Sequence, residues 1–143
     1  MEELKVKDIM TRSVITVLED ALVYEAVEML VDNDISGLAV TSADGELVGV
    51  LSEADMARVV SGDMKGDLGK ITVKEIMTSP AITVNREDDL REAVRLMGIY
   101  SIHRLIVQQE VKVGEKTRFF PAGILSISDV VKAMARNRCC RLL

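Results

Sequence analysis

The hydrophobic and polar positions of the chain predict an alternation of strands and helices. Short runs rich in β-branched residues predict strands, and apolar residues at intervals of three and four predict helices with one buried face. Asp44-Gly45 predicts a tight hairpin turn between two of the strands. The expected order is strand, helix, strand, strand, helix, over residues 13–17, 22–30, 38–40, 47–51 and 55–60.

The same pattern occurs a second time. The phrase Val-Lys-Asp-Ile-Met-Thr at 6–11 returns as Val-Lys-Glu-Ile-Met-Thr at 73–78, and 14 of the 35 residues in 6–40 are identical in 73–107. Each copy closes on a second shared phrase, at 49–55 and 123–129. A copy near 60 residues would bury too little surface to be stable alone, so we expect the two to pack on each other.

The copies define the expected domain boundaries. We assign residues 1–61 to the first repeat, the Gly-rich polar stretch 62–70 to a linker, 71–135 to the second repeat and 136–143 to a C-terminal tail. The second repeat carries seven additional residues between Val107 and Gly123, with a turn near Gly114-Glu115. This insertion predicts longer hairpin arms or a protruding loop, which we expect to be a contact surface.

Composition and charge exclude several classes of protein. A net charge of −5 at pH 7 argues against a nucleic-acid binder. No apolar run reaches the ~18 to 20 residues of a membrane span, and the N-terminus is acidic, so we expect a soluble cytoplasmic protein. The two cysteines, Cys139 and Cys140, are adjacent and predict neither a disulfide nor a zinc site. A single histidine and no recognisable nucleophile-base pair argue against an enzyme.

The ordered set of motifs resembles a known family. The Ile-Met-Thr opening, the Ile-Thr-Val strand, the Glu-Ala-Val helix and the Gly-hydrophobic-hydrophobic-Ser-x-x-Asp close, all duplicated, resemble two CBS domains, which together form a Bateman module. The resemblance implies an α/β (α+β) fold, β-α-β-β-α in each repeat, packed about a pseudo-twofold axis with two clefts. The resemblance also implies adenosine derivatives as ligands, which such clefts commonly bind. The second repeat resembles the regulatory γ subunits of AMP-activated kinases around Ile102-His103-Arg104.

The resemblance also implies the ligand-binding residues. By analogy, each cleft takes its Ser and Asp from one repeat and other residues from the other repeat. One site would contain Val50, Ser52, Asp55, Ala81, Ile82, Ile102 and Arg104. The other would contain Val14, Ile15, Ile35, Ser36, Ile124, Ser126 and Asp129, and His103 would reach phosphate in either. The first repeat has Ser36-Gly37 where the second has His103-Arg104, so we expect unequal affinities.

The chemistry of these residue types fits an adenine nucleotide. A carboxylate accepts both hydroxyls of a ribose, an apolar slot holds adenine, and an Arg fork binds phosphate. Two structural alternatives stay open. The Ser-x-x-Asp spacing also matches a helix capping box, and His103 and Arg104 also fit exposed residues beside a strand.

We therefore expect a stand-alone regulatory module that binds AMP, ADP, ATP or a related adenosyl compound such as S-adenosylmethionine or NAD, and requires no other cofactor. Apolar residues near the closing helices favour a homodimer: Val59, Val60, Val130, Val131 and Met134. The alternative is a ligand-independent module that dimerises or docks on an enzyme or transporter. An unidentified target protein fits either interpretation.

Overall fold

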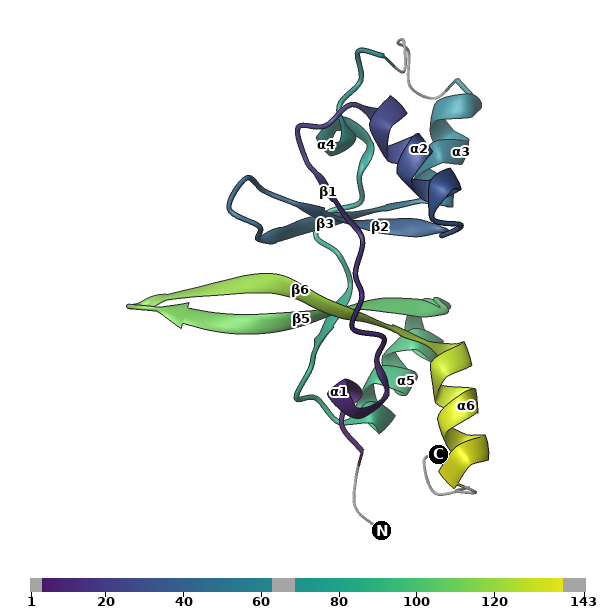
Figure 1. The fold of residues 1–143 in the computed structure, drawn as a ribbon, viewed down its shortest axis with the longest axis vertical. Coiled ribbons are helices and arrows are strands. Elements are labelled where there is room, and N and C mark those ends of the chain that lie inside the picture. The colour runs from purple at the N-terminus through teal and green to yellow at the C-terminus, as the bar shows by residue number, and fades with distance from the viewer. Residues whose placement is uncertain (1–3, 63–68, 138–143) are drawn as a thin grey trace. The chain divides into compact units, whose positions relative to one another are not determined.

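The chain folds into helices and two separate β-sheets (Figure 1). The structure is a computed structural model that describes residues 4–62 and 69–137. The strands are β1 (Thr16–Leu18), β2 (Gly37–Thr41), β3 (Leu47–Ser52), β4 (Thr83–Asn85), β5 (Arg104–Val113) and β6 (Lys116–Ser126). The helices are α1 (Val6–Ile9), α2 (Val23–Asp32), α3 (Glu53–Val60), α4 (Val73–Ile76), α5 (Leu90–Tyr100) and α6 (Ile127–Asn137). The predicted α/β class and the duplicated order of strands and helices are confirmed. One short helix is added before the first strand of each repeat, α1 before β1 and α4 before β4.

The chain divides into two compact units, each built on one sheet. The first-sheet unit comprises Ile15–Ala81, and the second-sheet unit comprises Met1–Val14 and Ile82–Leu143. Each unit therefore contains the opening phrase of the other repeat: α4 belongs to the first-sheet unit and α1 to the second-sheet unit. The predicted repeat boundaries follow sequence similarity and stay a prediction. Cys139, Cys140 and most of the predicted linker and tail lie outside the described residues.

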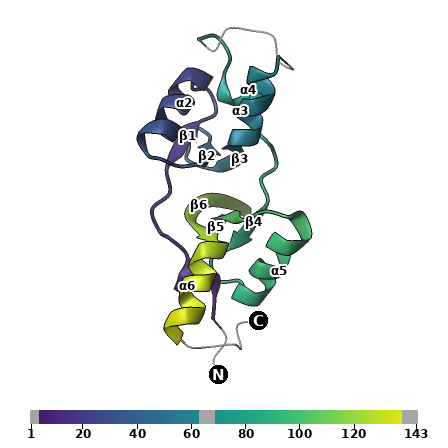
Figure 2. The ribbon, with the colours of Figure 1, turned by 90° about the vertical axis from the view of Figure 1, so that its right-hand side faces the viewer.

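In the first-sheet unit, β1 pairs parallel with β2, and β2 pairs antiparallel with β3. A crossover through α2 joins the parallel strands, and α2 and α3 lie on the same face of the sheet (Figure 2). The predicted turn is present, because the N–H of Gly45 donates to the carbonyl of Ser42 at 2.9 Å and Gly45 has a φ of 85°. Alternate residues of the strands and the inner faces of the helices form an aliphatic core: Val17, Val23, Ala26, Leu30, Leu38, Val40, Leu51, Ile71, Val73 and Ile76.

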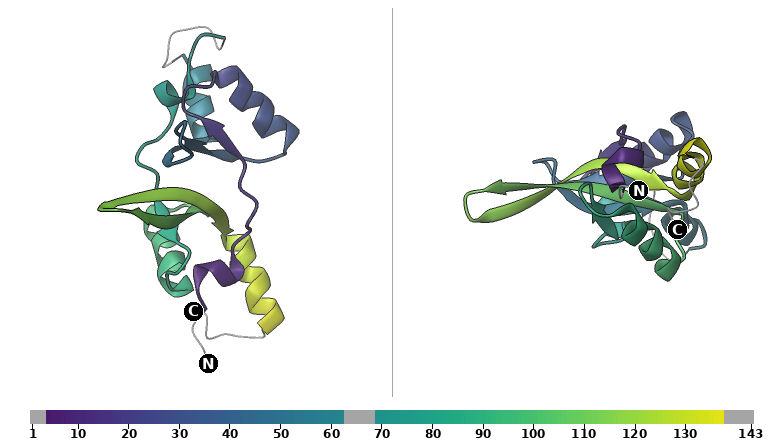
Figure 3. Two further views of the ribbon diagram at one scale, coloured as in Figure 1. Left: turned by 60° about the vertical axis from the view of Figure 1, so that its left-hand side comes forward. Right: turned by 90° about the horizontal axis from the view of Figure 1, so that it is seen from below.

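The second-sheet unit repeats this topology with a longer hairpin. β4 pairs parallel with β5 only from Thr83 to Asn85, whereas β5 and β6 pair antiparallel as far as Val113 and Lys116. Beyond Gln108 the two strands therefore continue as a ribbon that projects past the sheet (Figures 1 and 3). The insertion thus forms longer hairpin arms, as predicted, with its turn at Gly114, whose φ is 63°. Its role as a contact surface stays a prediction.

The opening helices dock beside the start of the long helix in each unit. The N–H of Val6 donates to the carbonyl of Asp88, and the N–H of Val73 donates to the carbonyl of Ala21, at 2.9 and 2.8 Å. Val6 and Val73 are fully buried. Identical residues in the two opening phrases therefore make equivalent contacts. Among the described residues, no helix has the length and apolar character that crossing a membrane requires.

Candidate functional site

The two shared phrases meet in the structure. In the first-sheet unit, Val50 of β3 and Thr78 exchange two backbone hydrogen bonds of 3.0 and 2.9 Å. In the second-sheet unit, Ile124 of β6 and Thr11 exchange two of 2.9 Å. The opening phrase of one repeat thus adds an extended segment beside the closing phrase of the other repeat. This contact explains why both phrases are duplicated together.

A glycine permits this close approach in each unit. A Cβ built on Gly49 would lie 2.8 Å from both the Thr78 carbonyl oxygen and the Met77 sulfur. A Cβ on Gly123 would lie 2.7 Å from the Thr11 carbonyl oxygen and 2.8 Å from the Met10 sulfur. Side-chain carbons do not approach backbone oxygen so closely, so the first residue of the Gly-hydrophobic-hydrophobic-Ser phrase has a steric reason to be glycine.

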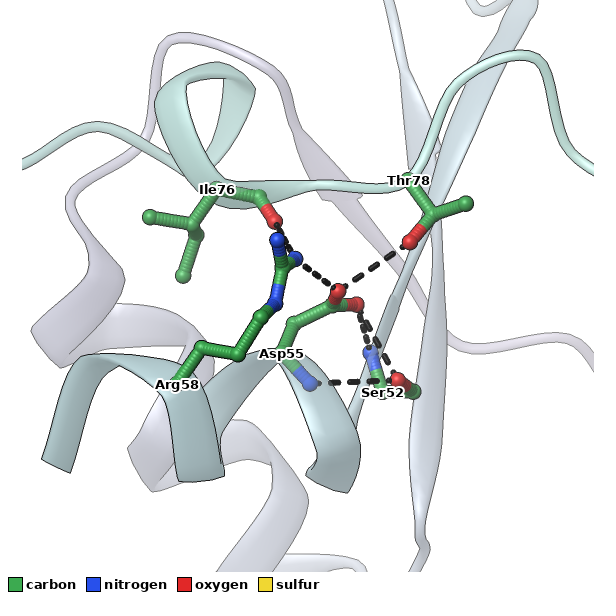
Figure 4. A network of polar contacts seen from close by, with 5 residues as sticks. All are labelled: Ser52, Asp55, Arg58, Ile76 and Thr78. Atoms are coloured by element: carbon green, nitrogen blue, oxygen red, sulfur yellow. Dashed lines mark hydrogen bonds and ion pairs between the residues drawn. The ribbon is translucent and has the colours of Figure 1, made fainter. Parts of the chain in front are cut away.

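Asp55 is the centre of a polar network in the first-sheet unit (Figure 4). It is 3% exposed, in the first turn of α3. Its Oδ2 accepts from the N–H of Ser52 at 2.8 Å and from Ser52 Oγ at 3.0 Å. Its Oδ1 accepts from Thr78 Oγ1 at 3.0 Å and from Arg58 Nη2. Ser52 Oγ accepts in turn from the N–H of Asp55 at 3.4 Å, so the predicted capping box is present.

Asp129 occupies the equivalent place in the second-sheet unit. Its Oδ2 accepts from the N–H of Ser126 at 3.1 Å, and the N–H of Asp129 donates to Ser126 Oγ at 3.0 Å. This reciprocal pair again caps a helix. Within the described residues, no donor is bound to Asp129 Oδ1. The same motif therefore gives a fully engaged carboxylate in one unit and a partly engaged one in the other.

The remaining predicted residues are divided between the units. Val50, Ser52, Asp55, Ala81, Ile15, Ile35 and Ser36 lie in the first-sheet unit. Val14, Ile82, Ile102, His103, Arg104, Ile124, Ser126 and Asp129 lie in the second-sheet unit. Each predicted site draws on both lists, and its composition stays a prediction. Within single units, the structure brings Val50 beside Thr78 and places the Arg104 backbone directly opposite Ser126.

The residues that precede β2 and β5 contact the closing helices through their backbones. The carbonyl of Ser36 accepts from the N–H of Glu53 at 3.2 Å, and the carbonyl of His103 accepts from the N–H of Ile127 at 3.0 Å. Ser36 precedes β2 and Glu53 begins α3, while His103 precedes β5 and Ile127 begins α6. Each hydrogen bond therefore joins the residue before a strand to the first residue of the closing helix of that unit. Ile35 and Ile102 are half-buried and pack on the cores of their units. His103 and Arg104 are exposed.

Sequence reasoning did not include Thr78 or Arg58 among the site residues. The Ile-Met-Thr repeat was the available signal for Thr78, because a duplicated polar residue at the end of an apolar phrase indicates a shared contact. Arg58 follows Asp55 by three residues on α3, a spacing that places the two side chains on one helix face. Among the described residues, no cluster of three or more His, Cys, Asp and Glu side chains has the arrangement of a metal site.

Charged contacts fix the opening helix of the second-sheet unit. Lys7 Nζ and Lys5 Nζ lie 2.9 and 3.2 Å from the Glu87 carboxylate. The hydrogen bonds from Lys7 and then Lys5 lower the pKa of Glu87 below its ordinary value. Glu87 lies in the turn between β4 and α5, so these ion pairs join the first residues of the chain to the second repeat.

The sequence matches a known protein family and a relative of known activity. The CBS domain family model matches residues 6–62 and again residues 73–136. The chain is 36% identical over 127 residues to a homoserine O-acetyltransferase of Methanocorpusculum labreanum. That match covers 89% of this chain but only 24% of the relative, so the chain spans about a quarter of that protein's length.

Solved structures of CBS domains have the same fold. A structure of CBSX2 in complex with AMP is 27% identical, with a TM-score of 0.72 over 94% of this chain and 98% of that one. A CBS domain pair of the protein MJ0100, in complex with 5-methylthioadenosine and S-adenosyl-L-methionine, is 25% identical, with a TM-score of 0.72 over 92% and 99%. With both repeats matched by the family model, the chain belongs to the CBS domain family as a tandem CBS pair.

Proposed function

We propose that this CBS pair is a regulatory module that binds an adenosyl ligand, with the Ser-x-x-Asp carboxylates receiving the ribose. The observation that carries the proposal is the Asp129 carboxylate. It is held in place by the N–H of Ser126 through Oδ2, while Oδ1 has no donor among the described residues. A fixed carboxylate with free acceptor capacity suits a ribose, whose neighbouring hydroxyls both donate.

Other residues of the same unit suit the rest of an adenosyl group. Asp129 lies in the first turn of α6, where the helix dipole favours an anionic group such as phosphate. Ile124 and Val14 are half-buried residues of the same unit. Such partly exposed aliphatic side chains are the usual lining for a flat aromatic base.

The comparisons support the ligand class. CBSX2 was solved with AMP, and the MJ0100 pair was solved with 5-methylthioadenosine and S-adenosyl-L-methionine, and all three ligands contain adenosine. The resemblance to kinase γ subunits around Ile102-His103-Arg104 favours a nucleotide phosphate in this chain. Arg104 begins β5 with its backbone directly opposite Ser126. This register supports Arg104 as the cation proposed for the phosphate.

Self-association is the second part of the proposal. Among the residues predicted to form a dimer surface, Val60 and Val131 are 86% and 56% exposed. Val130 is only 3% exposed and belongs to the core of its unit, so its predicted place on that surface is wrong. The outer faces of the long helices add the exposed residues Tyr24, Val31, Ile99 and Tyr100. Helix faces of this kind favour a homodimer over a solvated monomer.

A thermal-shift screen against AMP, ADP, ATP, NAD and S-adenosylmethionine tests the ligand proposal. At about 100 times the dissociation constant, a ligand stabilises the folded state by about 2.7 kcal/mol, which raises the melting temperature by several degrees. An unchanged melting temperature with all five ligands at millimolar concentration would support the alternative, a ligand-independent interaction module docked on an enzyme or transporter.

A further inference from the structure

Asp55 has no acceptor capacity left for a ligand. An ionised carboxylate offers about four lone-pair sites. Four donors already use them: the Ser52 N–H and Ser52 Oγ on Oδ2, and Thr78 Oγ1 and Arg58 Nη2 on Oδ1. The carboxylate is 4% exposed, so these donors also shield it from water. A ribose hydroxyl could bind Asp55 only after one of them leaves.

Arg58 is the only charged donor among the four that bind Asp55. Its Nη2 pairs with Asp55 Oδ1 and also donates to the carbonyl oxygen of Ile76 at 3.1 Å (Figure 4). The guanidinium thus joins α3 to α4, the opening helix of the other repeat. A charge-assisted hydrogen bond is about twice as strong as a neutral one. A ribose hydroxyl is neutral and does not replace it at equal strength.

The second-sheet unit lacks this arrangement. Lys132 follows Asp129 by three residues, as Arg58 follows Asp55, but its side chain is exposed and makes no ion pair with another described residue. Thr11 stands in the place of Thr78 and contacts Ile124 through its backbone. Asp129 Oδ1 therefore has neither of the two donors that Asp55 Oδ1 binds within the described parts of the chain.

We propose that Arg58 is a latch on Asp55, which sets the order in which the two carboxylates take up ligand. This inference rests on the proposed adenosyl function. Asp129 is the high-affinity position because its Oδ1 is already available. Asp55 is the low-affinity position because, while Arg58 is bound, a ribose hydroxyl must displace a donor before it can bind. The unequal affinities expected from the sequence thus follow from the closing helices, at Arg58 and Lys132, as well as from the difference between Ser36-Gly37 and His103-Arg104.

Calorimetric titration of AMP into Arg58→Met tests the latch, with Lys132→Met as the matched control. Met keeps an unbranched apolar side chain but removes the guanidinium. The wild type should show one strong and one weak binding event. Arg58→Met should strengthen the weak event by about ten- to a hundredfold, the range expected for one charge-assisted hydrogen bond. Lys132→Met should leave the weak event unchanged.

Two further variants assign each binding event to one carboxylate. Asp129→Asn should abolish the strong event and Asp55→Asn the weak one. If Arg58→Met does not fold, Thr78→Val serves instead, because it removes the other donor to Oδ1 and should also strengthen the weak event. Two equal events in the wild type, or a weak event that Arg58→Met leaves unchanged or weakens, would overturn the latch alone. Absence of binding in every variant would overturn the adenosyl function on which it rests.

Discussion

Thr78 Oγ1 donates a 3.0 Å hydrogen bond to Asp55 Oδ1, although the two residues belong to different sequence repeats. Thr78 ends the opening phrase of the second repeat, and Asp55 ends the closing phrase of the first. The hydrogen bond thus joins the two duplicated phrases at a carboxylate that the family resemblance predicts to bind ligand. Exchange of the opening segments therefore contributes to the candidate site as well as to the fold.

Thr78→Val should destabilise the protein by about 1 to 2 kcal/mol. Valine keeps the shape but removes one of four donors to a buried carboxylate, and hydrogen bonds to charged groups contribute in this range. Thr11→Val is the control, since no hydrogen bond from the Thr11 hydroxyl is found in the described parts of the chain, and it should change stability by less than about 0.5 kcal/mol. Urea unfolding measures both. Equal effects in the two variants would contradict the assigned role of Thr78.

The sequence predicted the elements well because their signals are local. The β-branched run at 13–17 predicts a strand, although the observed β1 is Thr16–Leu18. Asp44-Gly45 and Gly114-Glu115 predict turns from neighbouring residues alone. The exchange of opening segments was not predictable in this way, because periodicity does not specify which sheet a segment joins. The Ser-x-x-Asp motif alone does not distinguish Asp55 from Asp129 as candidate ligand residues. Their difference depends on Thr78, which reaches Asp55 only in the folded chain, and on Arg58, whose counterpart Lys132 has the same spacing but makes no ion pair with another described residue.

Gly49→Ala and Gly123→Ala should each destabilise the protein by about 1 to 3 kcal/mol, the usual cost of overpacking. The new methyl group would lie 2.8 and 2.7 Å from a carbonyl oxygen of the opposing segment. Gly98→Ala in α5 is the control, because a Cβ added there would have open space within 4 Å. That helical substitution should stabilise the protein by about 0.5 to 1 kcal/mol. Thermal unfolding of the three variants measures whether each substitution stabilises or destabilises the protein. A stabilising effect of Gly49→Ala or Gly123→Ala would refute the close approach of the two segments.

The ion pairs of Glu87 predict a pH dependence. Its pKa in the folded chain is lowered by Lys7 and Lys5, so the pairing favours folding above the unfolded pKa and is lost as the pH falls through the folded one. NMR titration should find the Glu87 carboxyl below its ordinary pKa. Lys7→Met should raise that pKa towards the ordinary value, whereas Lys74→Met, which removes a pair with Asp20, should not. An unchanged Glu87 titration in Lys7→Met would show that the contact is absent in solution.

Arg104→Ala should separate phosphate recognition from adenosine recognition. An Arg–phosphate contact is charge-assisted, so the variant should bind AMP at least about tenfold more weakly and adenosine almost as well as the wild type. Added salt should weaken AMP binding to the wild type as the contact is screened. Equal losses for AMP and adenosine in calorimetry would mean that Arg104 shapes the site without contacting the phosphate.

Calorimetry of AMP binding to Asp129→Ala, beside the wild type, tests whether the Asp129 carboxylate receives the ribose. The substitution removes the acceptor proposed for the ribose, and the loss of one helix-capping carboxylate costs only about 1 kcal/mol of stability. Circular dichroism should therefore show a folded variant. The wild type should bind AMP, and the strong binding event should be lost in Asp129→Ala. A folded variant with unchanged stoichiometry and affinity would contradict it and would leave Asp129 as a helix cap alone.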